Sequence, residues 1–331
     1  MNGTEPHPAV VPRRIPALSI VVPNYNHGHL IGEALGAMAG QTAPPFEIIV
    51  VDDGSTDDSV ARIRALAGNL PLQLHCHPKN RGVVAAMNTG LSLVKGDFVL
   101  FSAADDRLAD KTVELAAASA AEFPEAGIVF SDHAEMSADG SDARMMPLDL
   151  PSARHHFSSR DFIALMQQSF FGFHVSSVWF NVELLRALGG FRPELRWHCD
   201  LFVTYAAAFA RGATYVPGAV SYFRQQPTSY GTAGSRSNAQ VDVLRAWLAA
   251  TREPGWGATR AAFVAAAILP EYSFRAMRAM CSDPGYLTPR LIRRLVWFSC
   301  WVKVAPFVGV RARAWMRGIR SRYRKSRLTS S

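Results

Sequence analysis

The segment FEIIVVDDGSTDDSVARIRALAG, residues 46–68, reads as an apolar strand followed directly by a helix. Its first part, 46–55, is rich in β-branched residues and breaks off at Asp52 and Asp53. Its second part, 56–68, starts with the Thr/Asp signature of a helix N-terminus and ends at a glycine. The strand is apolar throughout, as expected where helices cover both faces of a parallel sheet.

The same alternation of strand and helix continues on both sides of this segment. The other predicted strands of the first half are 18–26, 71–77 and 96–106, and the other predicted helices are 29–41 and 81–96. Further along we expect helices at 111–123 and 199–212 and a strand at 126–133. Residues 174–190 should form a strand followed by a helix, and residues 213–225 two short strands. From Ala239 onward we expect helices only. The sequence therefore predicts an α/β fold with a mixed, mostly parallel sheet flanked by helices.

Polar clusters follow three of the predicted strands. They are the segment from Asn24 to Asn26, the pair Asp52–Asp53, and the pair Asp105–Asp106. An open α/β sheet binds its ligand beyond the carboxyl ends of its strands. We therefore expect the three clusters to converge on one crevice.

Composition places the chain among ordinary globular proteins. It has 331 residues, 49% of them hydrophobic and 19% charged, enough for one large domain or two modest ones. The four cysteines are far apart and form no CxxC pair, so they predict neither a disulfide framework nor a zinc site and fit a reducing compartment. Residues 1–17 are rich in proline and lack the apolar core of a signal peptide, which predicts a flexible lead.

The net charge of +8 comes from the C-terminus. Residues 284–331 hold twelve Lys/Arg and no Asp/Glu, whereas residues 1–283 hold 23 basic and 27 acidic residues. The apolar run within 291–310 is interrupted by Lys303 and Pro306 and is too short to span a bilayer. With its arginines and tryptophans, this tail predicts a helix on an anionic membrane surface, or alternatively a helix packed on the main domain. The sequence contains no motif for recognition of nucleic acid, and we do not expect nucleic acid as a partner.

Two classes of nucleotide-binding enzyme can be set aside, because this chain lacks their motifs. A dinucleotide-dependent oxidoreductase needs G-x-G-x-x-G after the first strand, where this chain has PNYNHGH. A nucleotidyltransferase usually starts with a glycine-rich, basic phosphate loop, which is missing.

Six stretches in order, SIVVPNYN, FEIIVVDDGSTDDS, NRGVVAAMNTGL, GDFVLFSAADD, ALGGF and CDLF, resemble glycosyltransferase family 2. That family contains inverting nucleotide-sugar enzymes of the GT-A fold. The resemblance implies a catalytic domain at 18–230, with a nucleotide-sugar half at 18–106 and an acceptor half at 107–230. Residues 231–331 would then form a helical C-terminal extension with the basic tail.

The resemblance implies donor contacts in the first half. Asp53 would accept the N–H of a uracil-type base, and Asp52 would touch the ribose or fix the loop. Arg81 would contact a phosphate or the base. The base pocket would be shaped by Pro23, Tyr25 and Asn26. The alternatives are a tight turn capping a helix for the aspartates, packing for Tyr25 and a solvated side chain for Arg81.

A divalent cation is expected, because the leaving nucleoside diphosphate carries about three negative charges and Mn²⁺ or Mg²⁺ prefers carboxylate and phosphate oxygens. Asp105 and Asp106 would supply the carboxylates, with a helix cap as the alternative. Many relatives have a further Asp where this chain has Ala103, so the diphosphate must complete the coordination. Where many relatives have a metal-binding or diphosphate-binding His, this chain has Gln226, a weaker ligand. Arg224 would pair with the diphosphate.

Asp200 matches the family's general base, which takes the proton from the acceptor hydroxyl. Its alternative is the acidic first turn of a helix. Trp197 and His198, just before it, are expected to contact the acceptor, because aromatic faces stack on sugar rings. The remaining histidines, among them His155, His156 and His174, match no standard ligand spacing, and each is expected to be a loop or acceptor-pocket residue.

These features predict an inverting glycosyltransferase. It would transfer a sugar from a nucleotide donor, expected to be of the UDP type, to a hydroxyl of a glycan or lipid-linked glycan in polysaccharide or cell-envelope synthesis. We expect it in the cytoplasm, peripheral on the inner face of the membrane. The alternative is a non-catalytic or weakly active nucleotide-sugar-binding protein of the same fold.

Overall fold

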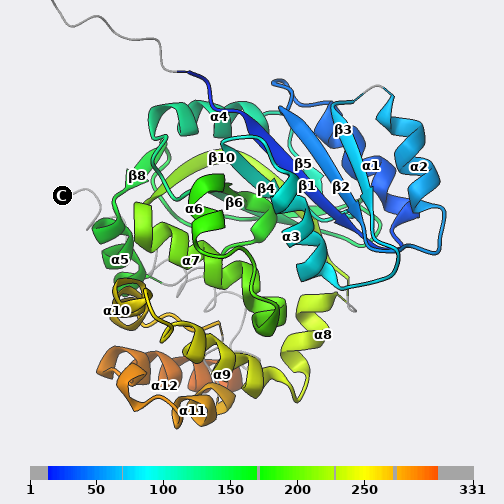
Figure 1. The fold of residues 1–331 in the computed structure, drawn as a ribbon. Coiled ribbons are helices and arrows are strands. Elements are labelled where there is room, and N and C mark those ends of the chain that lie inside the picture. The colour runs from blue at the N-terminus through cyan, green and yellow to red at the C-terminus, as the bar shows by residue number, and fades with distance from the viewer. Residues whose placement is uncertain (1–13, 69, 170–171, 227–228, 271–273, 305–331) are drawn as a thin grey trace, which may run out of the picture.

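The computed structural model describes residues 14–304, apart from 69, 170–171, 227–228 and 271–273 (Figure 1). Within them the chain forms one ten-stranded sheet. Its strands are β1 (Leu18–Asn24), β2 (Glu47–Asp52), β3 (Leu72–Cys76), β4 (Phe98–Phe101), β5 (Arg107–Leu108), β6 (Ile128–Met136), β7 (Ala143–Met146), β8 (His155–Phe157), β9 (Val178–Asn181) and β10 (Ala213–Arg224).

The helices that surround the sheet are α1 (Gly28–Ala39), α2 (Ser59–Ala67), α3 (Val83–Leu93), α4 (Thr112–Glu122), α5 (Ser159–Gln168), α6 (Val182–Ala187), α7 (Cys199–Arg211), α8 (Tyr230–Arg236), α9 (Gln240–Ala250), α10 (Gly257–Ala266), α11 (Phe274–Met280) and α12 (Pro289–Val304). Short 3-10 helices lie at η1 (Val175–Ser177), η2 (Pro193–His198) and η3 (Pro284–Tyr286).

The sheet is mixed and mostly parallel, as predicted. Its strand order is β3-β2-β1-β4-β9-β6-β10-β5, with β7 paired to β6 and β8 to β10. β1, β2, β3, β4, β6 and β10 run in one direction, and β9, β5, β7 and β8 run against them. The register sets Asn24 at the end of β1 beside Asp52 at the end of β2. Two of the predicted polar clusters therefore start as neighbours.

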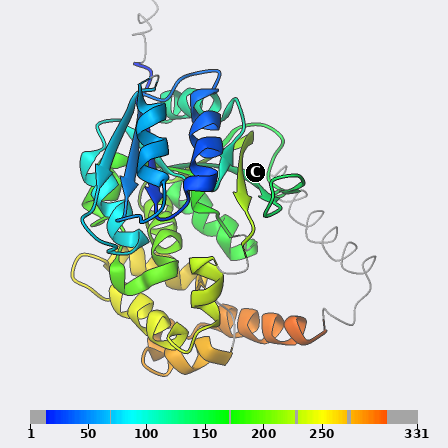
Figure 2. The same cartoon turned by 90° about the vertical axis from the view of Figure 1, so that its right-hand side faces the viewer.

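Helices cover both faces of the sheet, which explains why its central strands are apolar throughout. Along β1, Ile20 faces a cluster with α1, α2 and α4, whereas Val21 faces a cluster with α3, α6 and α7. Both side chains are fully buried. Figures 1 and 2 show this three-layer arrangement from two sides.

Several boundaries differ from the sequence prediction. The two short strands expected at 213–225 are one strand, β10, whose pairing with β6 is irregular between Val216 and Ser221. The helix expected from residue 56 begins at Ser59, because Asp57 and Asp58 belong to the turn before it. The strand expected to reach residue 106 ends at Phe101, and the chain turns before β5.

The C-terminal helices pack on α7 through aromatic side chains. The ring of Phe202 on α7 lies 4.9 Å from that of Trp247 on α9 and 5.3 Å from that of Phe263 on α10. Trp247 and Phe263 are fully buried in the same cluster as α7. The domain boundary at residue 230 stays a prediction.

The last described helix, α12, is docked by its own arginines. Arg290 and Arg294 donate hydrogen bonds to the carbonyl oxygens of Ala265 and Ala266 at the end of α10. Helix C-termini attract such cations because their last carbonyl groups lack partners. Two of the tail's arginines therefore hold α12 on the protein. Residues 305–331 of the predicted tail lie outside the described residues. No helix in the described part of the chain has the length and hydropathy to cross a bilayer.

Candidate active site

The carboxyl ends of β1 and β2 are joined by side-chain hydrogen bonds. Asn24 donates through Nδ2 to Asp52 Oδ2 at 2.8 Å. The other oxygen, Asp52 Oδ1, accepts the backbone N–H of Ser55 at 2.9 Å, and Ser55 Oγ accepts the backbone N–H of Asn26. Asp52 thus fixes its own loop, which was one of its two predicted roles. Its predicted contact with a ribose stays a prediction.

Asp53 holds the loop that precedes α3. Its carboxylate accepts the backbone N–H groups of Arg81 and Gly82 at 2.7–3.1 Å, and it faces His77 Nδ1 at 2.6 Å. Asp53 and His77 are both buried. The other nitrogen of His77 lies 3.0 Å from Thr89 Oγ1 on α3. A nucleobase would have to share this carboxylate, so the contact between Asp53 and a base stays a prediction. The Arg81 side chain is exposed beside it.

Pro23 and Tyr25 flank the same strand end. Pro23 is half-buried, and Tyr25 is 41% exposed. The exposure of Tyr25 does not fit the packing alternative, and it leaves the ring accessible to a ligand.

A cavity of about 790 Å³ lies at the tip of β4 and the end of β10. Asp105, Asp106 and Asp200 all line it, together with Trp197 and Gln226. The expectation of one crevice for all three polar clusters is met only in part, because the residues at the ends of β1 and β2 do not line this cavity. The link is α3, whose first turns contribute to the cavity wall while the loop before it is held by Asp53.

Asp105 and Asp106 differ in their surroundings. Asp106 is buried, and burial together with the neighbouring Asp105 charge raises its pKa to about 7. Its Oδ1 accepts the backbone N–H of Arg224 at 3.2 Å, and the nearby Ser176 hydroxyl also lowers its pKa, but Oδ2 makes no hydrogen bond of normal length to the described residues. Asp105 Oδ2 accepts a hydrogen bond from Gln226 Nε2 at 2.9 Å. Gln226 therefore holds a carboxylate, in the place where relatives have a histidine.

The Asp105–Asp106 pair fits a hard divalent cation. Two adjacent carboxylates face a cavity, and one buried oxygen makes no hydrogen bond of normal length in the described structure, so a cation would relieve the cost of burying that charge. Over residues 14–304, the gaps aside, no three His, Cys, Asp or Glu side chains form a closed metal site. Asp105 and Asp106 could therefore hold the ion only with ligands from elsewhere, such as a diphosphate.

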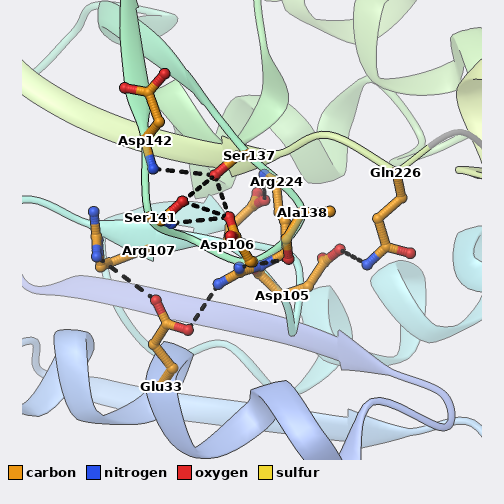
Figure 3. A network of polar contacts seen from close by, with 11 residues as sticks. Glu33, Asp105, Asp106, Arg107, Ser137, Ala138, Ser141, Asp142, Arg224 and Gln226 are labelled. Carbon is orange, nitrogen blue, oxygen red and sulfur yellow. Dashed lines mark hydrogen bonds and ion pairs between the residues drawn. The ribbon is translucent and has the colours of Figure 1, made fainter.

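Arg224 lines the cavity, but protein groups hold its guanidinium. Its side chain is 2% exposed, and the guanidinium donates to Glu33 Oε2, Ala138 O and Asp105 O (Figure 3). Glu33 is 191 residues away in sequence and meets Arg224 only through the fold, and the predicted pairing of Arg224 with a diphosphate stays a prediction.

Asp200 begins α7 and lines the cavity. Burial raises its pKa to about 6, although the backbone N–H of Leu201, which donates to Oδ1 at 2.7 Å, lowers it. Just before it, Arg196 has a φ of 46° and a ψ of −118°, a backbone conformation that non-glycine residues rarely adopt. Such strained residues cluster at functional sites, where the surrounding structure compensates for the strain.

Trp197 and His198 are held by one residue of α9. Gln240, fully buried, accepts from Trp197 Nε1 at 2.7 Å, and its Nε2 lies 3.0 Å from His198 Nε2. Trp197 lines the cavity and packs so closely on Gly234 that a Cβ there would lie 2.2 Å from the indole. His198 is turned to Gln240 and is not among the cavity's lining residues. Unlike Trp197, His198 therefore does not face the cavity in which an acceptor would bind, and its acceptor contact stays a prediction.

Two residues escaped the sequence prediction, and a third, His174, was expected only as a loop or acceptor-pocket residue. His77 supports Asp53, and Glu33 supports Arg224. His174 lines the cavity and stacks on Phe223 at 4.1 Å, and burial lowers its pKa to about 3. His77 carried a local signal, since it precedes the glycine loop before a helix. Nothing in the sequence around Glu33 indicated its role.

The comparisons with known sequences agree with one another. The family model described as Glycosyl transferase family 2 matches residues 19–184. The PGL/p-HBAD biosynthesis glycosyltransferase of Mycobacterium bovis is 35% identical over 119 residues, 35% of this chain and 46% of that protein. Chondroitin synthase of Pasteurella multocida is 30% identical over 128 residues, 39% of this chain and 13% of that protein. The matched region thus spans less than half the length of these curated relatives.

Solved structures share the fold over most of the chain. TarS 1–349 of S. aureus, in complex with UDP-GlcNAc, has a TM-score of 0.59 at 20% identity and covers 81% of this chain and 73% of that one. The mannosyltransferase PcManGT of Pyrobaculum calidifontis, in complex with GDP-Man and Mn²⁺, has a TM-score of 0.55 at 22% identity. The match covers 95% of this chain and 86% of that one. At these identities the likeness concerns the fold, and the predicted GT-A fold is confirmed.

Proposed function

Because the chain belongs to glycosyl transferase family 2, we propose that it is an inverting glycosyltransferase with a nucleotide-sugar donor. The observation that carries the proposal is the cavity in which Asp105, Asp106 and Asp200 meet. A carboxylate pair for the leaving diphosphate and a separate carboxylate for the acceptor are the groups that a single displacement needs.

In this mechanism Asp200 takes the proton of the acceptor hydroxyl. The acceptor oxygen forms a bond to the anomeric carbon while the bond from that carbon to the phosphate oxygen breaks, so the configuration inverts. The electron pair leaves with the nucleoside diphosphate. Asp105 and Asp106 would hold the divalent cation, which when bound supplies positive charge for the leaving group. Gln226 keeps Asp105 in place.

The nucleotide is proposed to lie along the ends of β1 and β2. Asn26, Asp52 and Asp53 form the hydrogen-bonded base of this region, and Arg81 stands exposed beside it. We propose a UDP-type donor, which the family resemblance implies. The related fold of TarS, solved with UDP-GlcNAc, supports this choice, while PcManGT with GDP-Man is the competing precedent.

The acceptor is proposed to be a hydroxyl of a glycan or lipid-linked glycan in cell-envelope synthesis. Support comes from two relatives, a PGL/p-HBAD biosynthesis glycosyltransferase and a chondroitin synthase. Trp197 provides an indole at the cavity wall, suitable for stacking on a sugar ring.

We also propose that α12 binds an anionic membrane on the cytoplasmic side. Its buried face holds Leu291 and Leu295, but its outer face carries a second apolar stripe at helical spacing. Ile292, Val296 and Trp297 on that stripe are 48%, 57% and 40% exposed. Figure 2 shows α12 at the lower edge of the molecule, extending away from the sheet. From residue 284 on the sequence has no acidic residue, so the positive charge of this C-terminal segment suits anionic lipid.

Serine at the three stripe positions, Ile292, Val296 and Trp297, is expected to weaken membrane binding about tenfold or more, since each apolar side chain contributes roughly 1 kcal/mol or more when buried. Flotation with vesicles of phosphatidylcholine and phosphatidylglycerol measures the bound fraction. The matched control replaces Phe46 and Met145, exposed apolar residues elsewhere, with serine. Equal flotation of the stripe variant and the wild type, or no flotation of either, would refute the membrane surface.

Activity is expected to fall on acidification as Asp200 takes up a proton. Its pKa of about 6 lies above the ordinary value of 3.8, so the protonated, inactive form persists to a higher pH than for an exposed aspartate. With saturating Mn²⁺, kcat/KM should be flat above pH 7 and drop about tenfold per pH unit well below the pKa. A profile that stays flat down to about pH 4 would exclude Asp200 as the base.

Calorimetry of UDP binding with Mn²⁺ tests the donor site directly. The proposal requires saturable binding of UDP that weakens when Mn²⁺ is removed. Binding of UDP without any sugar transfer would instead favour the non-catalytic alternative, and no binding of UDP or GDP would remove the basis of both.

A further inference from the structure

Arg224 is a charged side chain enclosed by protein. It ends β10, and its guanidinium is directed to three separate parts of the chain (Figure 3). Nε donates to the carbonyl oxygen of Asp105 at 3.0 Å, Nη1 to that of Ala138 at 2.9 Å, and Nη2 to Glu33 Oε2 at 2.7 Å. A planar guanidinium with fixed donor directions orients all three partners at once.

The strand end that carries Arg224 also fixes both carboxylates of the proposed cation site. The backbone N–H of Arg224 donates to Asp106 Oδ1 at 3.2 Å, and Gln226, two residues on, donates to Asp105 Oδ2. Any shift of Arg224 would therefore move the donors of Asp105 and Asp106 together.

The turn between β6 and β7 closes over the guanidinium. Gly140 in this turn has a φ of +76°, and a Cβ there would lie 3.0 Å from Arg224 Nη1. The close approach keeps water from the guanidinium, so its charge needs a partner within the protein.

Glu33 on α1 provides that partner. It lies on the other side of Arg224 from the carboxylate pair, as Figure 3 shows, and is 40% exposed. Arg107 lies 3.7 Å from its second oxygen. Without the Glu33 charge, the guanidinium would keep its place beside Asp105, whose carbonyl oxygen it already contacts, with no acidic partner of its own, and its charge would then oppose a cation at that site.

We propose that Glu33 and Arg224 are positioning residues for the cation site: the pair holds Asp105 and Asp106 in place, and Glu33 keeps the guanidinium charge from opposing a cation there. This inference rests on the proposed function, in which those two carboxylates serve a divalent cation. It assigns a role in metal binding to a residue on the first helix, far from the carboxylates in sequence.

The test measures the Mn²⁺ concentration needed for half-maximal binding of UDP, by calorimetry, with free Mn²⁺ followed by electron paramagnetic resonance. Glu33→Gln keeps the shape and removes the charge, and it should raise that concentration about 10- to 100-fold, as loss of a residue that orients a metal ligand does. Binding of uridine without metal should not change. A purely structural role would alter the melting temperature and spare the Mn²⁺ requirement.

Glu122→Gln is the matched control. Glu122 forms a comparable pair with Arg154 at 2.8 Å, outside the cavity lining. It should leave the Mn²⁺ requirement within about twofold of the wild type. An equally small effect of Glu33→Gln on the folded protein would overturn the inference.

Arg224→Lys provides a second variant that retains the charge but loses the guanidinium fork. It should also raise the Mn²⁺ requirement, and the double variant with Glu33→Gln should need more Mn²⁺ than Arg224→Lys alone but less than the two single losses combined, because the lysine charge still needs Glu33 while the orientation by the pair is already lost. Fully additive losses would contradict the inference. Failure of the wild type to bind UDP with Mn²⁺ would instead reject the proposed function, so the two failures are distinguishable.

Discussion

Asp200→Asn is expected to lower turnover by about 10²- to 10⁴-fold while UDP still binds with Mn²⁺ as tightly as to the wild type. Asparagine has nearly the same shape but cannot take the proton of an acceptor hydroxyl. The Asp200 carboxylate lines the cavity, and its raised pKa shows that it retains a proton more readily than an exposed aspartate. Steady-state rates and calorimetry of the same preparation separate turnover from binding.

The control for this substitution is Asp161→Asn. Asp161 lies in the first turn of α5, as Asp200 does in α7, so it reports the cost of losing an acidic residue at a helix start. Activity of Asp161→Asn should stay near that of the wild type. Near-normal turnover of Asp200→Asn would show that Asp200 is not the base and only stabilises the start of α7.

Asp105→Asn is expected to lower the affinity for Mn²⁺ in the presence of UDP by about a hundredfold or more, and activity with it. Asp105 faces the cavity and accepts from Gln226, and removing its charge leaves only Asp106 for the cation. Titration of Mn²⁺ against UDP binding measures the change.

Asp110→Asn, at an exposed aspartate five positions further on, is the control and should bind Mn²⁺ and UDP as the wild type does. Unchanged Mn²⁺ dependence in Asp105→Asn would mean that this carboxylate does not hold the ion.

The sheet could be predicted because its central strands are buried on both faces. Ile20 and Val21 point to opposite layers and are both fully buried, so the strand must be apolar throughout, and that pattern is visible in sequence. The irregularity in β10 between Val216 and Ser221 has no such signature, and it caused one strand to be predicted as two.

The residues that line the cavity were predicted better than those that hold them. Asp105, Asp106 and Asp200 stand at element ends, where sequence patterns are informative. The partners of Arg224 and His198 are 191 and 42 residues away and are brought together only by packing. A polar residue at a strand end has a recognisable place, but the direction of its side chain depends on distant neighbours.

A donor screen tests the central claim most directly. Release of nucleoside diphosphate is read across UDP- and GDP-sugars, with Mn²⁺ and with or without a panel of simple glycosides as acceptors. The account predicts release from at least one UDP-sugar, dependence on Mn²⁺, and loss of that release in Asp200→Asn. The account would be contradicted if the folded wild type released nucleoside diphosphate from none of the donors. It would also be contradicted if the Asp200→Asn variant released as much as the wild type.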